Sequence, residues 1–232
     1  MGTSSTVMGR QRAFKDAVRR NTSLTAQVER RVLVWMAERA PRWVSSDGLT
    51  ALGLAAQLGA GVFYAAARWH RWALPAVCGC IVLNWLGDSL DGTLARVRGQ
   101  QRPRYGFYVD HVVDVFGSIA LMGGLACSGL AHVEVAIAML VAFLLLCAES
   151  YLATYTLGCF EMSQGIFGPT EIRLLLIAGN LALLRSPWIT VAGHRMLLFD
   201  VGGTIGAVSM AALAVGTTAR HTAALYREEP LP

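Results

Sequence analysis

Charged residues are scarce in this sequence. Only 15% of its 232 residues are Asp, Glu, Lys or Arg, whereas 54% are hydrophobic. Soluble globular domains contain about 25% charged residues, so this balance excludes an ordinary water-soluble domain and favours a membrane protein. Residues 1–9 are small and polar and lack the apolar core of a signal peptide, and we expect a disordered start without a cleaved leader.

Cysteine is also sparse. The number of cysteines is odd, they fall in or beside apolar segments, and their spacing is not that of metal ligands. No histidine has a partner at zinc-ligand spacing either. We therefore interpret the cysteines as small hydrophobic side chains and exclude a disulfide framework; they are Cys78, Cys80, Cys127, Cys147 and Cys159.

The basic residues point to a lipid surface. A formal charge of +5 would suit a nucleic-acid partner, but the basic residues are confined to the N-terminal tail and the loops. Anionic lipid headgroups attract basic segments placed in this way. The sequence thus favours a membrane surface as the partner and argues against nucleic acid.

Six apolar stretches are long enough to cross a membrane. A transmembrane helix needs about 20 apolar residues, and the stretches at 49–67, 72–95, 106–130, 134–157, 167–185 and 196–218 approach or reach that length. The fifth is the weakest because its uninterrupted apolar part, 172–184, is short and lies between Pro169 and Pro187. The sequence predicts an all-α integral membrane protein with six transmembrane helices.

An arginine-rich segment, residues 10–42, precedes the first span. Its apolar residues recur at helical spacing and alternate with charged ones, which predicts an amphipathic helix in the membrane interface; these apolar residues are Leu24, Val28, Val32 and Trp35. A solvated helix or tail is the alternative. Pro41 ends this element, and Asp47 is a candidate N-cap for the next. We predict one domain, with a tail and juxtamembrane helix at 1–47 and a six-helix bundle at 48–220.

The distribution of positive charge predicts the orientation. With six spans and both termini in the cytoplasm, sixteen of the twenty Lys and Arg residues lie on the inside and four on the outside. Cytoplasmic loops carry this excess of positive charge. We expect a multi-pass protein, in the inner (plasma) membrane if the host is a bacterium, with cytoplasmic N- and C-termini.

Four aspartates interrupt the second and third apolar stretches. Asp88 and Asp91 are three residues apart, and Asp110 and Asp114 are four apart, so each pair shares one helix face. Four carboxylates within lipid are very unfavourable without a counter-charge. Magnesium and manganese bind carboxylate oxygens, and two such cations form a clamp suited to phosphoryl chemistry. We expect all four aspartates to hold two divalent cations, Mg²⁺ or Mn²⁺.

The spacing of these residues is more specific than their charge. It follows the pattern D-x-x-D-G-x-x-A-R, nine further residues, then G-x-x-x-D-x-x-x-D. This pattern resembles the signature of the CDP-alcohol phosphotransferase (CDP-alcohol phosphatidyltransferase) family, membrane enzymes that join an alcohol to the phosphate of a CDP-linked alcohol and release CMP. The matching residues are Asp88, Asp91, Gly92, Ala95, Arg96, Gly106, Asp110 and Asp114.

The resemblance implies a role for each of these positions. Asp114 would be the general base that takes the proton of the attacking hydroxyl. The CDP group would bind at Asp88, Gly92, Ala95, Arg96 and Gly106, where small side chains leave room for it. Packing between helices is the alternative for Gly92, Ala95 and Gly106, and Arg96 could pair with a carboxylate or contact the nucleotide. The resemblance also implies a homodimer and substrates of which at least one is a lipid.

The fourth and fifth spans are expected to supply the acceptor pocket. Polar candidates there are Glu149, Tyr151, Tyr155, Glu171 and Arg173. Gly168, Pro169 and Glu171 resemble the G-P-x-E element of the choline/ethanolamine phosphotransferase branch, although an ordinary loop and helix cap gives the same pattern. Since Arg173 is the single Lys or Arg between residues 158 and 173, the sequence favours a neutral or cationic acceptor over a phosphorylated one.

The roles of the loop arginines and the class of protein each have an alternative interpretation. Arg98, Arg102 and Arg104 would either meet phosphates or only mark the cytoplasmic side. His111 adjoins Asp110 but lies on another helix face, and we interpret it as a residue that packs or that supports a metal ligand from behind. A membrane divalent-cation transporter or channel could use the same aspartates. It would not explain Gly92, Ala95 and Arg96 at their spacing, and a family member without activity is at odds with a complete signature.

Overall fold

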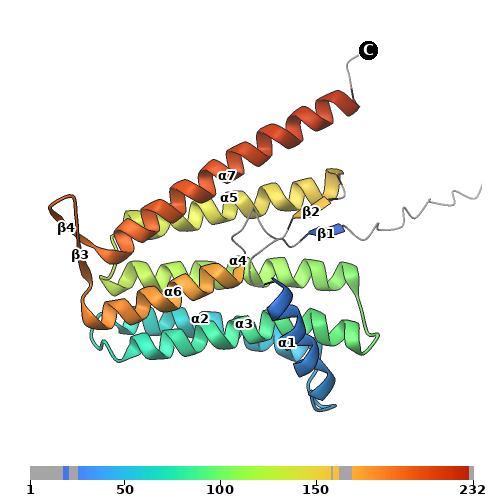
Figure 1. Cartoon of the computed structure of the whole chain (residues 1–232), viewed down its shortest axis with the longest axis horizontal. Coiled ribbons are helices and arrows are strands. Elements are labelled where there is room, and N and C mark those ends of the chain that lie inside the picture. Colours follow the sequence, from blue (N-terminus) through green and yellow to red (C-terminus); the bar gives the residue numbers. More distant parts are fainter. Residues whose placement is uncertain (1–17, 21–25, 158, 162–168, 230–232) are drawn as a thin grey trace, which may run out of the picture.

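The structure is a computed structural model that describes residues 18–20, 26–157, 159–161 and 169–229. Each apolar stretch in these ranges forms a helix (Figure 1), and the predicted all-α membrane fold is confirmed. The helices in the six predicted stretches are α2 (Ser46–Ala66), α3 (Ala73–Val97), α4 (Pro103–Ser128), α5 (Val133–Leu157), α6 (Pro169–Arg185) and α7 (Leu198–Glu228). The predicted tail at 1–9, Leu24 and Gly168 lie outside the described residues.

Two of these helices differ from the predicted lengths. Five helices among the described residues are long and apolar enough to cross a membrane, and α6, with 17 residues, is not one of them. At 1.5 Å per residue, α6 extends about 25 Å, less than the roughly 30 Å of a bilayer core. The count of six spans therefore stays a prediction. Helix α7 has 31 residues and continues beyond the predicted boundary at 220.

Helix α1 (Ala26–Arg39) runs across the spanning helices near the ends of α3 and α4 (Figure 1). Leu33 and Ala37 are buried, whereas Val28 and Trp35 are exposed. An exposed apolar face beside arginines is typical of a helix in the membrane interface, and that location remains a prediction.

The start of α2 corrects one expectation. Asp47 is not the N-cap, because the helix begins at Ser46 and the hydroxyl of Ser45 accepts the backbone N–H of Gly48 at 3.0 Å. Asp47 lies in the first turn instead, where it pairs with Arg102 at the start of α4. A carboxylate in the first turn is favourable in its own right because it faces the positive end of the helix dipole.

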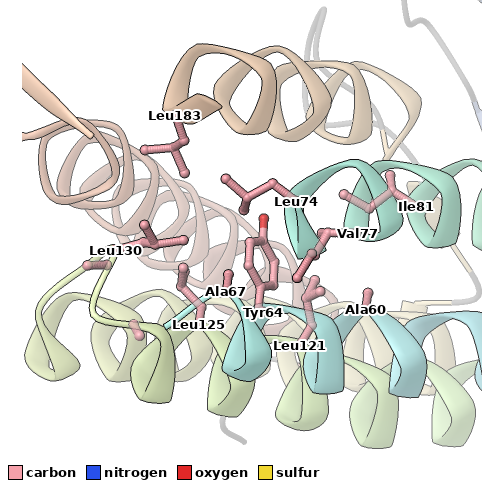
Figure 2. Packing of buried hydrophobic residues seen from close by; sticks show 13 residues of the cluster. Ala60, Tyr64, Ala67, Leu74, Val77, Ile81, Leu121, Leu125, Leu130 and Leu183 are labelled. Carbon is pink, nitrogen blue, oxygen red and sulfur yellow. The ribbon is translucent and has the colours of Figure 1, made fainter. Parts of the chain in front are cut away.

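Helix α2 packs against both α3 and α4 and forms the core with them. Tyr64, Val77 and Leu125 are fully buried where these helices meet (Figure 2). Glycines allow the close approach: a Cβ on Gly87 of α3 would lie 2.5 Å from the carbonyl oxygen of Leu49 on α2. Helices α5 and α7 form a second pair, and α6 packs against α3.

Short strands join some of the helices. β3 (Trp188–Val191) and β4 (His194–Leu197) form an antiparallel hairpin before α7. Its turn residues, Ala192 and Gly193, have φ values of 49° and 83°, as a two-residue hairpin turn of type I′ requires. β1 (Val18–Arg20) pairs in parallel with β2 (Cys159–Glu161), which connects the segment before α1 to the one after α5.

Candidate active site

The four aspartates lie at one end of the bundle. Asp88 and Asp91 are near the carboxyl end of α3, and Asp110 and Asp114 are near the amino end of α4, which follows after a short loop. Asp114 is close enough to Asp88 and Asp91 for their charges to interact. Helix α2, which packs against both α3 and α4, holds the two pairs in this arrangement.

Asp91 is buried and is held by donors from two helices. The hydroxyl of Thr50 on α2 donates to its Oδ2 at 2.5 Å, and the backbone N–H of Gly92 donates to its Oδ1. The hydroxyl of Ser46 also donates to the Asp91 backbone carbonyl at 3.0 Å. These contacts fix the orientation of the Asp91 carboxylate relative to the start of α2.

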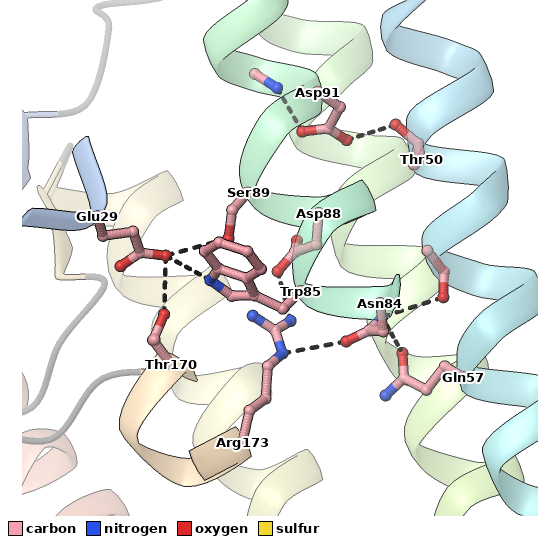
Figure 3. A network of polar contacts seen from close by, with 12 residues as sticks. Glu29, Thr50, Gln57, Asn84, Trp85, Asp88, Ser89, Asp91, Thr170 and Arg173 are labelled. Carbon is pink, nitrogen blue, oxygen red and sulfur yellow. Dashed lines mark hydrogen bonds and ion pairs between the residues drawn. The ribbon is translucent and has the colours of Figure 1, made fainter. Parts of the chain in front are cut away.

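Asp88 forms an ion pair with α6. The Nη2 of Arg173 lies 2.5 Å from Oδ2 of Asp88, and its Nε donates to Oδ1 of Asn84 at 3.1 Å (Figure 3). Asn84 in turn donates to the Gly53 carbonyl and to Oε1 of Gln57 on α2. A planar guanidinium that binds two oxygen acceptors at once fixes both distance and direction between α3 and α6.

The carboxylates of the four aspartates suit a divalent cation. Carboxylate oxygens are the ligands that Mg²⁺ and Mn²⁺ prefer, and these four aspartates are the residues that could hold such ions. Within the described ranges, no three His, Cys, Asp or Glu side chains are grouped as a ready metal centre. Two of the carboxylates instead engage hydrogen-bond donors of the chain, as carboxylates in a low-dielectric site must.

The signature glycines at this end face open space. A Cβ on Gly106 would meet nothing within 4 Å, and one on Gly92 would meet only the Arg96 side chain, at 3.5 Å. Helix packing therefore does not explain these two glycines, in contrast to Gly87. Arg96 is exposed, and its Nη2 donates to the hydroxyl of Thr93 at 2.9 Å.

Aromatic side chains of α4 and α5 pack together beside the aspartates of α4. His111 packs edge-on against Tyr151, with ring centroids 4.4 Å apart, and its Nδ1 lies 2.5 Å from the Phe107 carbonyl oxygen. Tyr151 is near enough to Asp110 and Asp114 for electrostatic interaction. A groove of about 310 Å³ opens here, lined by Phe107, Tyr108, His111, Val112, Val115, Phe116 and Tyr151. His111 packs against Tyr151, and whether it also supports the neighbouring Asp110 stays a prediction.

The candidate acceptor residues do not converge. Arg173 reaches Asp88, and Glu171 is buried two residues before it. Glu149 of α5 instead accepts from Nδ1 of His221 on α7 at 2.5 Å, and the side chain of Tyr155 is 90% exposed. Arg173 contacts the signature aspartate Asp88, and the acceptor pocket stays a prediction.

The loop arginines have a role that their sequence did not indicate. Both Nη atoms of Arg98 donate to backbone carbonyls between α1 and α2, at 2.5 Å to Val44, 3.1 Å to Ala40 and 2.9 Å to Pro41. Arg102 pairs with Asp47, as described above. These side chains tie the α1–α2 connection and the start of α2 to the loop between α3 and α4.

Sequence reasoning missed three residues around the aspartates: Thr50 contacts Asp91, Asn84 binds the Arg173 that pairs with Asp88, and Glu29 binds the neighbouring residues Trp85 and Ser89. Asn84 precedes Asp88 by one helical turn, and a polar residue at that spacing in an apolar span was a usable signal. Thr50 and Glu29 are far from the signature in sequence, and their spacing gave no signal. Thr50 reaches Asp91, and Glu29 reaches Trp85, only because α2 and α1 pack onto α3.

Comparisons with solved structures agree with this fold. Two crystal structures of the phosphatidylinositol phosphate synthase of Mycobacterium tuberculosis, one with CDP-DAG bound and one in complex with manganese and citrate, both superpose with a TM-score of 0.51. The first is 19% identical and covers 86% of this chain and 92% of its own, and the second is 20% identical, with 85% and 87% covered. Identities this low show the fold alone.

Sequence comparison provides the family. None of the curated proteins matches the chain. The profile of the CDP-alcohol phosphatidyltransferases matches residues 43–217, which include α2 to α6 and most of α7. All eight signature residues lie inside this range, and their carboxylates and glycines gather where α3 ends and α4 begins. The chain belongs to the CDP-alcohol phosphatidyltransferase family.

Proposed function

We propose that this protein transfers a substituted phosphate from a CDP-linked alcohol to an acceptor alcohol and releases CMP. The observation that carries the proposal is the position of the four signature aspartates, two near the carboxyl end of α3 and two near the amino end of α4, at the same end of the bundle. Carboxylates gathered from two helices in an apolar bundle are unfavourable unless they serve a site. The open space at Gly92 and Gly106 supports a ligand beside them.

The proposed cofactor is a pair of divalent cations, Mg²⁺ or Mn²⁺, held by Asp88, Asp91, Asp110 and Asp114. When bound, such cations neutralise the phosphate oxygens and orient the leaving group. Thr50 and Arg173 would keep Asp91 and Asp88 oriented in their absence. One of the similar crystal structures is a complex with manganese, which supports a divalent cation for this fold.

The proposed base is Asp114. The acceptor oxygen forms a bond to the phosphorus of the CDP-linked substrate, the bond from that phosphorus to the CMP oxygen breaks, and the hydroxyl proton passes to Asp114. A carboxylate held beside the phosphate can accept this proton as the acceptor oxygen attacks. Asp114 is only partly buried, which leaves it accessible to an acceptor.

The proposed donor is a CDP-linked lipid. Gly92, Ala95, Arg96 and Gly106 would receive its CDP group, and the open space that a Cβ would find at Gly92 and Gly106 supports this placement. The similar synthase was crystallised with CDP-DAG bound, which supports a donor of that class. CDP-choline and CDP-ethanolamine are the alternatives with a small alcohol on the CDP group.

The proposed acceptor is a neutral or cationic alcohol. A phosphorylated acceptor needs several cations around its phosphate. Arg173 is the single Lys or Arg between residues 158 and 173, and its guanidinium already binds Asp88 and Asn84. Binding a second phosphate there would compete with the ion pair that joins α3 to α6.

A donor and acceptor screen tests the proposal. Purified protein in lipid vesicles is incubated with CDP-diacylglycerol, CDP-choline or CDP-ethanolamine, each against a panel of alcohols, and CMP is measured. We expect CMP with one donor and a neutral or cationic alcohol, and none from the Asp114→Asn variant. CMP release only with glycerol 3-phosphate or inositol phosphate would refute the proposed acceptor class. Divalent-cation flux through vesicles that release no CMP would instead support a transporter.

A further inference from the structure

Glu29 on α1 binds the two helices that carry the ion pair Asp88–Arg173. Its Oε1 accepts three hydrogen bonds, from Nε1 of Trp85 at 2.8 Å, from the hydroxyl of Ser89 at 3.3 Å and from the hydroxyl of Thr170 at 2.9 Å (Figure 3). Trp85 and Ser89 belong to α3, and Thr170 belongs to the first turn of α6. One carboxylate therefore bridges three helices.

These partners flank the ion pair in sequence and in space. Ser89 directly follows Asp88, Trp85 lies three residues before it, and Thr170 lies three residues before Arg173 on the same helix. Residues three apart on a helix are neighbours on one face. The bridge through Glu29 consequently sets the separation of α3 and α6 one turn away from the contact between Asp88 and Arg173.

The other end of α1 is fixed independently. Leu33 and Ala37 pack against Leu49, Leu90 and Leu94 in a small buried cluster. Beyond the helix, Arg98 binds the carbonyls of Ala40, Pro41 and Val44. Helix α1 is thus held at its centre by apolar packing and beyond its end by Arg98, and Glu29 makes its polar contact with α6.

We propose that Glu29 is a positioning residue, through which α1 holds the cytoplasmic ends of α3 and α6 so that Asp88 and Arg173 stay in register. Helix α6 needs such support because it is short and has few contacts with α7. Glu29 itself does not touch the signature aspartates. The effect on turnover rests on the function proposed above, whereas the effect on α6 does not.

The test compares Glu29→Ala with Glu29→Gln and with Glu38→Ala. Gln keeps an Oε1 that can accept the same three bonds, and Glu38→Ala makes the same change at an exposed position of α1. Hydrogen exchange of residues 169–176 and turnover per folded molecule are measured in vesicles. For Glu29→Ala we expect exchange in the first two turns of α6 to rise about tenfold or more, and kcat to fall about tenfold to 100-fold.

The controls separate positioning from loss of folded protein. Glu29→Gln should keep a kcat close to that of the wild type, and Glu38→Ala should match the wild type in kcat and in exchange. Glu29→Ala combined with Thr170→Val should have the same kcat and exchange as Glu29→Ala alone, because both changes break the same contact. An unchanged kcat per folded molecule in Glu29→Ala would overturn the proposal, and so would unchanged exchange in α6. If the wild type releases no CMP, the proposed function fails, and the exchange measurement alone decides the role of Glu29.

Discussion

The guanidinium of Arg173 lies 2.5 Å from the carboxylate of Asp88 and joins the second turn of α6 to the carboxyl-terminal half of α3. Both side chains are largely shielded, with 16% and 26% of their surfaces exposed. A shielded ion pair is costly to break from one side, because the remaining charge stays without compensation. This contact therefore ties a signature aspartate to a helix outside the signature.

Replacement of Arg173 should show whether the contact matters for turnover. In Arg173→Ala, Asp88 loses its ion-pair partner and Asn84 loses a donor. We expect CMP release to fall about 100-fold, measured as initial rate per folded protein. Arg185→Ala, at the exposed end of the same helix, is the matched control and should retain the wild-type rate. Equal rates of CMP release in the two variants would show that Arg173 is not part of the active site.

The spanning helices could be predicted because their signal is local. Lipid requires a run of apolar residues of fixed length, and the predicted spans agree with α2 to α5 to within a few residues. The predicted helix ends were less accurate, because capping and the helix preference of polar residues decide where a helix begins and ends. Ser45 rather than Asp47 caps α2, and α7 continues past 220 because polar residues outside the bilayer also favour helix.

Only those features of the candidate site that depend on local sequence could be predicted. Helical spacing placed each pair of aspartates on one face, and the signature identified the glycines beside them. The contacts of Thr50 with Asp91 and of Glu29 with Trp85 join residues 41 and 56 positions apart. Such contacts follow from how the helices pack, and neither periodicity nor motif spacing encodes them. The same holds for Glu149, whose partner His221 lies on α7.

Removal of the proposed base or of the cations should stop the reaction without unfolding the protein. Asp114→Asn keeps the size of the side chain but cannot accept the proton, so CMP release should fall about 100-fold to 10,000-fold. Chelation of divalent cations should abolish CMP release, and added Mg²⁺ or Mn²⁺ should restore it. Asp47→Asn, outside the site, is the control. Wild-type rates in chelator-treated, metal-free buffer would refute the metal-dependent function.

Two glycines of α3 should respond differently to alanine. A Cβ on Gly87 would press against α2, 2.5 Å from the Leu49 carbonyl oxygen and 2.7 Å from the Gly53 nitrogen, whereas one on Gly92 has room. Gly87→Ala should lower the free energy of unfolding by about 1–3 kcal/mol. Gly92→Ala should keep the wild-type Tm and bind a CDP-linked donor more weakly. A lower Tm in Gly92→Ala with normal donor binding would favour a packing role for this glycine.

At the opposite end of the bundle, His132 joins the α4–α5 loop to α7. Its Nδ1 lies 2.5 Å from Oδ2 of Asp200, and its backbone N–H donates to Oδ1 of the same carboxylate at 2.7 Å. The hydrogen bond to Asp200 raises the pKa of His132, and the charges of Asp200 and Glu134 raise it further. The protonated imidazole is therefore favoured in the folded state.

This pair should make stability depend on pH. Because the folded-state pKa of His132 lies above its unfolded value of about 6.5, the stabilisation is complete below that pH and is lost as pH rises through the folded-state pKa. The Tm of the wild type in detergent should thus fall over this window relative to His132→Gln, which cannot titrate. His194→Gln, on the exposed strand β4, should follow the wild type. Parallel Tm curves for the wild type and His132→Gln would mean that the pair adds no pH-dependent stability.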